Sequence, residues 1–220
     1  MNSRSPDDPV AKALALDGDA DRIKDFYGDW ARSYDDDVAS EDYRAPEIIA
    51  SLARLIQLSW LGRAPADLRV MDAGCGTGLA GIALRSAGFP HVDGFDIAPA
   101  MTAKAEKTGA YGRLLAEIDL NADDPGLGAL NGTYDIVTCA GVFTLGHVAP
   151  EGLRHLFALS RHGGFVIIST RESYLNSSDF RGYVRQMERA GEATLIFTLP
   201  DASYVGDDRA DYWVFRKLPA

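Results

Sequence analysis

Hydrophobic positions near the start of the chain recur every three or four residues, which is the spacing of one helix face. Between residues 21 and 34 most of the side chains on this face are aromatic: Ile23, Phe26, Tyr27, Trp30, Ala31 and Tyr34. A second pattern of this kind begins at Pro46, a residue that suits the first turn of a helix, and runs to Gly62. The sequence therefore predicts two amphipathic helices before any strand.

From residue 68 onward, short apolar runs alternate with helical patterns. Strands joined through helices favour parallel pairing, right-handed crossovers and a sheet covered on both faces. The last two strands have only residues 200–211 between them, so one of them is expected to be antiparallel. The predicted strands are 68–72, 92–96, 113–119, 134–139, 165–170, 194–198 and 212–216, and the predicted helices are 79–87, 99–107, 153–160 and 180–190.

The composition changes this picture little. Apolar residues make up 46% of the 220 positions, charged residues make up 25%, and 22 positions are glycine, which excludes disordered, collagen-like and coiled-coil classes. A chain of this length can bury one sizeable core without disulfides. We expect residues 1–20 to be disordered or partly helical, 21–64 to form N-terminal helices, and 65–220 to form an α/β domain.

The charge balance limits the partners. There are 32 acidic and 22 basic residues, a formal net charge of −10, and no basic run, so broad contact with a nucleic acid backbone is not expected. Two isolated cysteines, Cys75 and Cys139, favour a reducing compartment. The sequence has neither the pattern of a signal peptide nor a bilayer-spanning stretch. We expect a cytoplasmic protein with no membrane partner, whose oligomeric state stays open.

Three glycines separate the first predicted strand from the next helix: Gly74, Gly76 and Gly78. A ligand can approach such a backbone closely because no Cβ intervenes. Open α/β sheets also bind ligands at the carboxyl ends of their strands. Asp96 ends the next strand, 20 residues after Gly76. Its carboxylate could accept both hydrogen bonds of a ribose diol.

Two cofactor classes share this arrangement. Residues 76–81 match the G-x-G-x-x-G pattern of dinucleotide sites, which keeps an NAD(P)-dependent oxidoreductase as an alternative. Asp72, two residues before Gly74, extends the pattern to D-x-G-x-G-x-G. About 68 residues with helical character precede this strand, whereas dinucleotide domains often begin with it.

With these residues the chain resembles the class I S-adenosylmethionine-dependent methyltransferases. The resemblance rests on residues 70–78, 94–101, 134–137 and 161–164. The opening Tyr27-x-x-Trp30-Ala31-x-x-Tyr34-Asp35 and the tail Tyr212-x-x-x-Arg216-Lys217 are most similar to the Williams–Beuren syndrome chromosomal region methyltransferase-like proteins.

The resemblance implies a Rossmann-like sheet of seven strands in the order 3-2-1-4-5-7-6, with strand 7 antiparallel and helices on both faces. It implies that residues 65–220 bind S-adenosyl-L-methionine and that the product is S-adenosyl-L-homocysteine. The acceptor of the methyl group is expected to be a small molecule that the sequence does not identify. The N-terminal helices, part of 174–178 and the 200–211 loop would form a lid.

Roles by position also follow from the resemblance. Gly74 and Gly76 would contact the methionine moiety, Asp96 the ribose, Ile97 and Met101 the adenine, and residues 140–142 the sulfonium side. The residues implied to bind the cofactor are Tyr27, Tyr34, Asp72, Ala73, Gly74, Cys75, Gly76, Thr77, Gly78, Asp96, Ile97, Met101, Asp119, Leu120, Ala140, Gly141 and Val142.

Candidates for catalysis and acceptor binding follow the later strands. His147 titrates near neutral pH and is the candidate general base, with a helix cap or a buried hydrogen bond as the alternative. Phe143, Arg171 and Tyr204 are the candidate substrate-binding residues. The four histidines are scattered, so no metal site is expected. Without an unmistakable base, a non-catalytic cofactor-binding or assembly protein stays a further alternative.

Several of these residues also have a purely structural interpretation. Asp72 could order the glycine loop, and Cys75 could be a small filler. The stripe that contains Tyr27 and Tyr34 could be only a packing face, and Asp119 only an exposed strand end.

Overall fold

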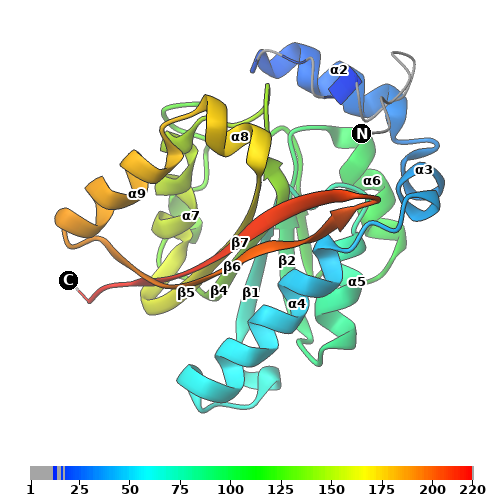
Figure 1. The fold of residues 1–220 in the computed structure, drawn as a ribbon. Helices are drawn as coiled ribbons and strands as arrows, with labels where there is room; N and C mark the ends of the chain where they lie inside the picture. The colour runs from blue at the N-terminus through cyan, green and yellow to red at the C-terminus, as the bar shows by residue number, and fades with distance from the viewer. Residues whose placement is uncertain (1–11, 14–15, 17, 220) are drawn as a thin grey trace.

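A computed structural model describes residues 12–13, 16 and 18–219 of the chain, and the prediction for residues 1–11 lies outside them. A seven-stranded sheet forms the centre (Figure 1). Its order is β3-β2-β1-β4-β5-β7-β6, and β7 runs antiparallel to both of its neighbours while the other pairs are parallel. The predicted order and the antiparallel strand are confirmed. The strands are β1 (Arg69–Ala73), β2 (His91–Phe95), β3 (Arg113–Leu115), β4 (Tyr134–Phe143), β5 (Ser160–Arg171), β6 (Ala193–Val205) and β7 (Asp208–Lys217).

Helices cover both faces of the sheet (Figure 1). One face packs against α7 (Leu153–Leu159), α8 (Glu172–Ser177) and α9 (Phe180–Arg189). The other face packs against α4 (Ala45–Ile56) and α5 (Leu79–Ser86).

Two more elements complete this part of the fold. Helix α6 (Pro99–Lys107) follows β2, and a π-helical turn, η1 (Gln57–Leu61), extends α4 to Gly62. The sequence therefore placed the end of this second helix correctly, because Gly62 adopts the left-handed conformation that ends helices.

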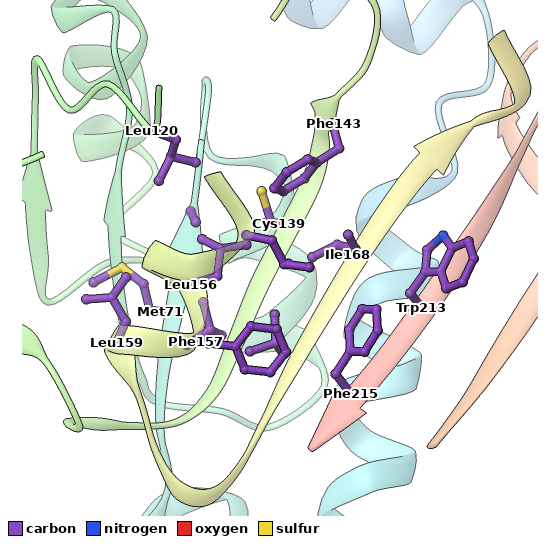
Figure 2. Close-up of a cluster of buried hydrophobic side chains, with 14 of the residues drawn as sticks. Met71, Leu120, Cys139, Phe143, Leu156, Phe157, Leu159, Ile168, Trp213 and Phe215 are labelled. Carbon is purple, nitrogen blue, oxygen red and sulfur yellow. The ribbon is translucent and has the colours of Figure 1, made fainter. Parts of the chain in front are cut away.

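The core follows the two-residue alternation of the strands. In β5, Val166 and Ile168 face the side of α7 and α9, whereas Phe165 and Ile167 face the side of α4. Figure 2 shows the first of these two clusters, in which the ring of Phe215 lies 5.8 Å from that of Phe157. Burial on both faces explains why these strands read as continuous apolar runs.

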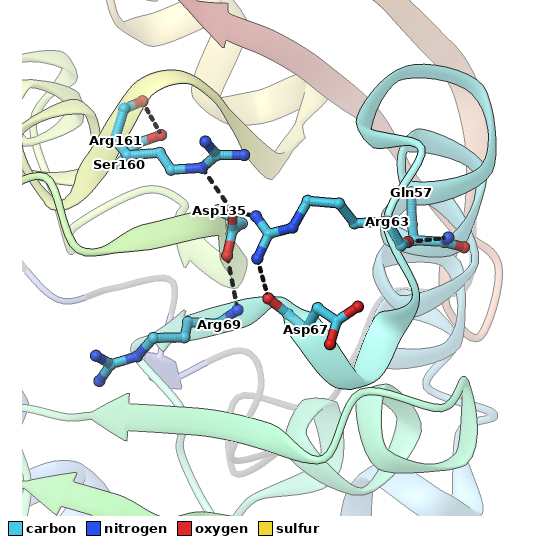
Figure 3. Close-up of polar contacts among 7 residues, drawn as sticks. All are labelled: Gln57, Arg63, Asp67, Arg69, Asp135, Ser160 and Arg161. Atoms are coloured by element: carbon cyan, nitrogen blue, oxygen red, sulfur yellow. Dashed lines mark hydrogen bonds and ion pairs between the residues drawn. The ribbon is translucent and has the colours of Figure 1, made fainter.

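A buried carboxylate connects elements at the amino ends of β1, β4 and β5. Asp135 accepts a hydrogen bond from Arg63 Nη1 at 2.7 Å and one from the backbone N–H of Arg69 at 2.8 Å, and it forms an ion pair with Arg161 (Figure 3). This network lies at the opposite end of the strands from the glycine loop, so it supports the fold and takes no part in the site.

The first predicted helix, 21–34, ends at Trp30, and a further helix that was not predicted follows it. Helix α2 (Ala20–Trp30) is followed by a turn and then by α3 (Tyr34–Ser40). Asp37 accepts hydrogen bonds from the Trp30 indole at 2.7 Å and from the Ser33 hydroxyl at 2.8 Å, which fixes the turn. The acidic first turn of α3 also suits the positive end of a helix dipole. Helix α2 lies beyond the carboxyl ends of the parallel strands (Figure 1).

Two further boundaries differ from the prediction. Strand β3 ends at Leu115 and not at 119, because Glu117 adopts a positive φ of 61° that a strand cannot contain. Residues 200–211 are not a loop: β6 and β7 form a long hairpin that turns at 206–207. Pro200 is accommodated at a register shift on the edge strand, where proline is tolerated. Helix α8 was not predicted.

Candidate functional site

A cavity opens at the carboxyl ends of β1, β2 and β4, with a volume of about 720 Å³ counting the space at its mouth. It brings together most of the residues predicted to bind the cofactor: Tyr27, Tyr34, Gly74, Gly76, Asp96, Ile97, Met101, Asp119, Leu120, Ala140, Gly141 and Val142. The remaining ones, which are Asp72, Ala73, Cys75, Thr77 and Gly78, do not line it. His147 also lines the cavity.

The glycine loop forms the floor of the cavity. Gly74 and Gly76 have φ values of 66° and 54°, a left-handed conformation that glycine adopts without strain. A Cβ at Gly74 would come within 2.2 Å of the Val142 side chain. The loop is attached to the neighbouring strand, because the backbone N–H of Cys75 donates to the carbonyl of Phe95 at 2.8 Å. The missing side chains therefore leave open backbone in the cavity.

Asp96 is held in a fixed orientation next to this loop. Its Oδ2 accepts a hydrogen bond from the backbone N–H of Gly76, and its Oδ1 accepts one from that of Ala98, both at 2.9 Å. Burial raises the pKa of Asp96, and the backbone donors oppose that rise. Each carboxylate oxygen can accept a second hydrogen bond, so an oriented double acceptor lies at the cavity wall.

Asp72 lies beneath the loop, fully buried. It accepts hydrogen bonds from the Tyr111 hydroxyl at 2.7 Å and from Thr138 at 3.3 Å. Tyr111 in turn accepts one from the backbone N–H of Gly81 at 3.1 Å. Burial raises the pKa of Asp72 to about 6. These contacts match the loop-ordering interpretation, since they join β1 to the start of α5.

The packing of a neighbouring side chain explains why position 81, the last of the dinucleotide-like pattern, is glycine. A Cβ at this position would lie 2.2 Å from the Tyr111 ring. The packing of Tyr111 is therefore sufficient to explain the glycine, and the pattern is no argument for a dinucleotide.

The other loop residues do not line the cavity and contact neighbouring elements instead. The Cys75 side chain is buried, and burial raises the pKa of its thiol. Thr77 donates a hydrogen bond to Asp35, which connects the loop to α3. Gly78 is the N-cap of α5.

His147 makes two side-chain hydrogen bonds. Its Nδ1 lies 2.7 Å from the carbonyl oxygen of Leu145, and its Nε2 lies 2.8 Å from the hydroxyl of Tyr27. A carbonyl only accepts, so Nδ1 carries the proton and Nε2 accepts from Tyr27. Burial lowers the pKa of His147, which favours this neutral form. The ring thus has a structural hydrogen bond and also a basic nitrogen at the cavity.

The α2 region is attached to the rest of the molecule at several points. Lys24 forms an ion pair with Glu117, and Lys104 donates to the carbonyl of Arg32 at 3.2 Å. Ahead of α2, the backbone N–H of Gly18 donates to the carbonyl of Gly146 at 2.9 Å.

Two of the three predicted substrate-binding residues line a smaller compartment beside the cavity. Arg171 and Tyr204 lie there, with the Arg171 guanidinium 5.6 Å from the centre of the Tyr204 ring. Phe143 does not: it is buried in the core, 6.2 Å from the ring of Tyr174. The change of face along β4 explains the difference, because Val142 points to the cavity and Phe143 away from it.

Sequence reasoning missed several lining residues. Tyr43 precedes α4 and lines the cavity, and the backbone N–H of the next residue, Arg44, donates to the carbonyl of Tyr204 at 2.7 Å. Asn121 lies in the loop after β3 and donates to the carbonyl of His147 at 2.7 Å. Neither residue belongs to a periodic pattern or a motif, so no local signal could have identified it.

Among residues 12–13, 16 and 18–219, no three His, Cys, Asp or Glu side chains are grouped as metal ligands would be. Within those ranges, no helix has the length and apolar character needed to cross a bilayer.

The fold and the site together define a known class of protein. The sequence profile of the methyltransferase domain family matches residues 41–209, and the chain belongs to that family. Members of the family take their methyl group from S-adenosylmethionine.

A human relative supports the finer resemblance. Methyltransferase-like protein 27 from Homo sapiens is 35% identical over 170 residues, which are 77% of this chain and 63% of the human protein. This relative confirms the resemblance to the Williams–Beuren region proteins. The chain spans less than two thirds of its length.

Solved structures show the same fold. Magnesium protoporphyrin IX methyltransferase from Synechocystis PCC 6803, crystallised with bound S-adenosylhomocysteine, aligns with a TM-score of 0.67 at 18% identity, over 90% of this chain and 100% of the other. A TehB-like S-adenosylmethionine-dependent methyltransferase from Corynebacterium glutamicum aligns with a TM-score of 0.62 at 20% identity, over 87% and 97% of the two chains.

Proposed function

We propose that this chain transfers a methyl group from S-adenosylmethionine to a small-molecule acceptor. The observation that carries the proposal is the cavity in which the Gly74–Gly76 turn lies next to the oriented carboxylate of Asp96. Open backbone on one side and a double hydrogen-bond acceptor on the other suit the two ends of an adenosyl amino acid.

The lining residues have complementary roles in this proposal. Asp96 accepts the hydrogen bonds of the ribose diol, and Gly74 and Gly76 pack against the methionine end. Ile97 and Met101 provide an apolar wall for the adenine, and Asp119 accepts from its amino group. Tyr27 and Tyr34 close the cavity from the lid, while Ala140, Gly141 and Val142 face the sulfonium side.

The residues that do not line the cavity support it. Asp72 and Thr77 connect the loop to Tyr111 and to Asp35, Cys75 connects it to β2, Ala73 ends β1, and Gly78 is the N-cap of α5. Replacing them would alter cofactor binding indirectly.

Methyl transfer from a sulfonium requires a general base only when the acceptor atom carries a proton. When bound, S-adenosylmethionine supplies a methyl group on a sulfonium sulfur. A lone pair of the acceptor atom forms the new bond to the methyl carbon, and the sulfur keeps the electron pair of the bond that breaks. The chain aligns the two reactants and excludes water, and such alignment can be worth ~7–11 kcal/mol of barrier. Where the acceptor atom carries a proton, Nε2 of His147 takes it, directly or through the Tyr27 hydroxyl.

Isothermal titration of the folded protein with S-adenosylmethionine and S-adenosylhomocysteine tests the proposal. We expect one site for each ligand and no site for NADH, which is titrated in parallel by fluorescence. Absence of binding at high micromolar ligand would refute the proposal. Transfer of a labelled methyl group to small molecules of a cell extract would then distinguish an enzyme from a protein that only binds the cofactor.

We also infer a cytoplasmic location, because Cys75 and Cys139 are both free thiols and suit a reducing compartment. Fractionation of cells that express the full chain would check this, and recovery in an oxidising compartment would overturn it.

A further inference from the structure

The smaller compartment beside the cavity has about 460 Å³ of space counting its mouth. Tyr27, Tyr34, Gly141 and His147 line both spaces, so a molecule in the compartment would be in contact with the wall that faces the proposed cofactor. The compartment therefore lies where an acceptor would have to be held.

The walls of the compartment are mainly aromatic. The rings of Trp30 and Tyr34 pack edge to face at 4.7 Å, and those of Tyr43 and Tyr204 do so at 5.4 Å. Rigid rings of this kind provide flat apolar surfaces for a ligand. The compartment therefore suits a small molecule with a flat, apolar body.

One positive charge points into this aromatic space. Arg171 is the only charged side chain among the described residues that line the compartment, and its side chain is 13% exposed. Its Nη2 donates to Asp208 at 2.6 Å. A guanidinium has five N–H donors in a planar fork, so donors remain for a second anionic group.

A buried hydroxyl that lines the same compartment as Arg171 has no hydrogen-bond partner in the described part of the chain. Thr144 is 6% exposed and lines the same compartment, and its Oγ1 makes no hydrogen bond within the described part of the chain. Buried polar groups are rarely left unsatisfied, and such exceptions point to a missing partner. A hydroxyl can donate to a carboxylate while Arg171 donates to the same group.

We propose that this compartment binds the methyl acceptor and that the acceptor is a small carboxylate with a flat, apolar body. The inference rests on the proposed function. Arg171 and Thr144 donate to the carboxylate, the tyrosine rings hold the body, and the acceptor atom faces the wall formed by Gly141 and His147. A cationic molecule offers no acceptor to Arg171, and a neutral one forms a hydrogen bond in which the donor alone is charged.

Three small aromatic probes that differ in charge test the proposal: benzoate, benzamide and benzylamine. Each is titrated by ligand-observed NMR into the full chain saturated with S-adenosylhomocysteine. We expect benzoate to bind at least about tenfold more tightly than benzamide, and benzylamine not to bind. Equal binding of benzamide or benzylamine, or no binding of benzoate at millimolar concentration, would overturn the proposal.

Variants then locate the site. Arg171→Met should weaken benzoate binding by about tenfold, and Thr144→Val by about threefold to tenfold, with the affinity for S-adenosylhomocysteine unchanged. Arg181→Met is the matched control, because Arg181 also pairs with an aspartate and lies over an aromatic ring but lines neither space. Unchanged benzoate binding in both site variants would contradict the proposal.

The outcomes separate the two proposals. If S-adenosylhomocysteine does not bind the wild type, the proposed function fails. If it binds but benzoate shows no preference, only the assignment of the acceptor fails. If Arg171→Met does not fold, the relative affinities of the three probes for the wild type and the benzoate affinity of Thr144→Val still test the assignment of the acceptor.

Discussion

The hydroxyl of Tyr27 donates a hydrogen bond to Nε2 of His147 at 2.8 Å, across 120 positions of the sequence. Tyr27 belongs to helix α2, and His147 follows β4. The side-chain bond therefore joins α2 to the carboxyl edge of the sheet over the cavity that both residues line.

Tyr27→Phe should loosen this attachment. It leaves the ring in place and removes one hydrogen bond, so we expect a loss of about 0.5–1.5 kcal/mol in the free energy of unfolding, measured with urea, and weaker binding of S-adenosylmethionine by calorimetry. Tyr183→Phe is the control, because Tyr183 is half-buried and its hydroxyl has no hydrogen-bond partner in the described chain. If both variants bind the cofactor like the wild type, the lid contact does not contribute to the site.

Asp96→Ala should weaken the binding of S-adenosylmethionine by about 1–3 kcal/mol, since the ribose hydroxyls would lose their acceptor. Titration calorimetry on the folded variant measures the change. Glu106→Ala removes an exposed carboxylate from the nearby α6 and should leave the affinity unchanged. Equal affinities of the Asp96 variant and the wild type would remove this carboxylate from the site.

The pKa of Asp72 predicts a dependence of stability on pH. Burial raises this pKa from 3.8 to about 6, so the folded state binds the proton more tightly than the unfolded chain. The resulting stabilisation is complete below pH 3.8 and is lost as the pH rises to about 6.

Asp72→Asn stays neutral at every pH and avoids that loss. Its free energy of unfolding should therefore rise relative to the wild type by up to about 3 kcal/mol across this window. Urea unfolding of both proteins from about pH 4 to pH 7 measures the difference. A difference that does not change with pH would show that the raised pKa is wrong.

Local features of the site could be predicted from the sequence, whereas its tertiary contacts could not. The glycine loop and Asp96 were found because strand, turn and helix signals follow one another within a few residues, and parallel strands bring their carboxyl ends to one edge. The sheet order came from the resemblance to a family, since apolar periodicity alone does not specify which strands pair.

The compartment that contains Arg171 could not be predicted from the sequence, because it is formed by tertiary contacts and not by a local pattern. Thr144 lies in a bend after β4 and belongs to no motif. The sequence predicts a loop at Tyr204, yet this residue lies in β6, because β6 and β7 pair as a hairpin through this region. The sequence predicts Asp119 at the end of a strand, but it reaches the cavity from the loop after β3, in which Glu117 turns the chain.

Gly146 connects the segment before α2 to the loop that contains His147. Its φ is 72°, and a Cβ there would lie 1.6 Å from the carbonyl oxygen of Leu16. Gly146→Ala must therefore displace the chain around Leu16 and Gly18, in addition to the strain of about 1–2 kcal/mol that alanine meets in a left-handed conformation. Gly132→Ala provides a close match, because Gly132 has a φ of 67° and open space at the same position.

We expect the free energy of unfolding, measured with urea, to fall by the strain energy in both alanine variants. Only Gly146→Ala should lose more stability than that and bind S-adenosylmethionine less tightly. The reason is that the backbone N–H of Gly18 donates to the Gly146 carbonyl. Displacing either residue breaks this bond and moves His147, which lines the cavity next to Tyr27. If the two variants show the same loss of stability and the wild-type affinity for the cofactor, the segment before α2 has no part in closing the cavity.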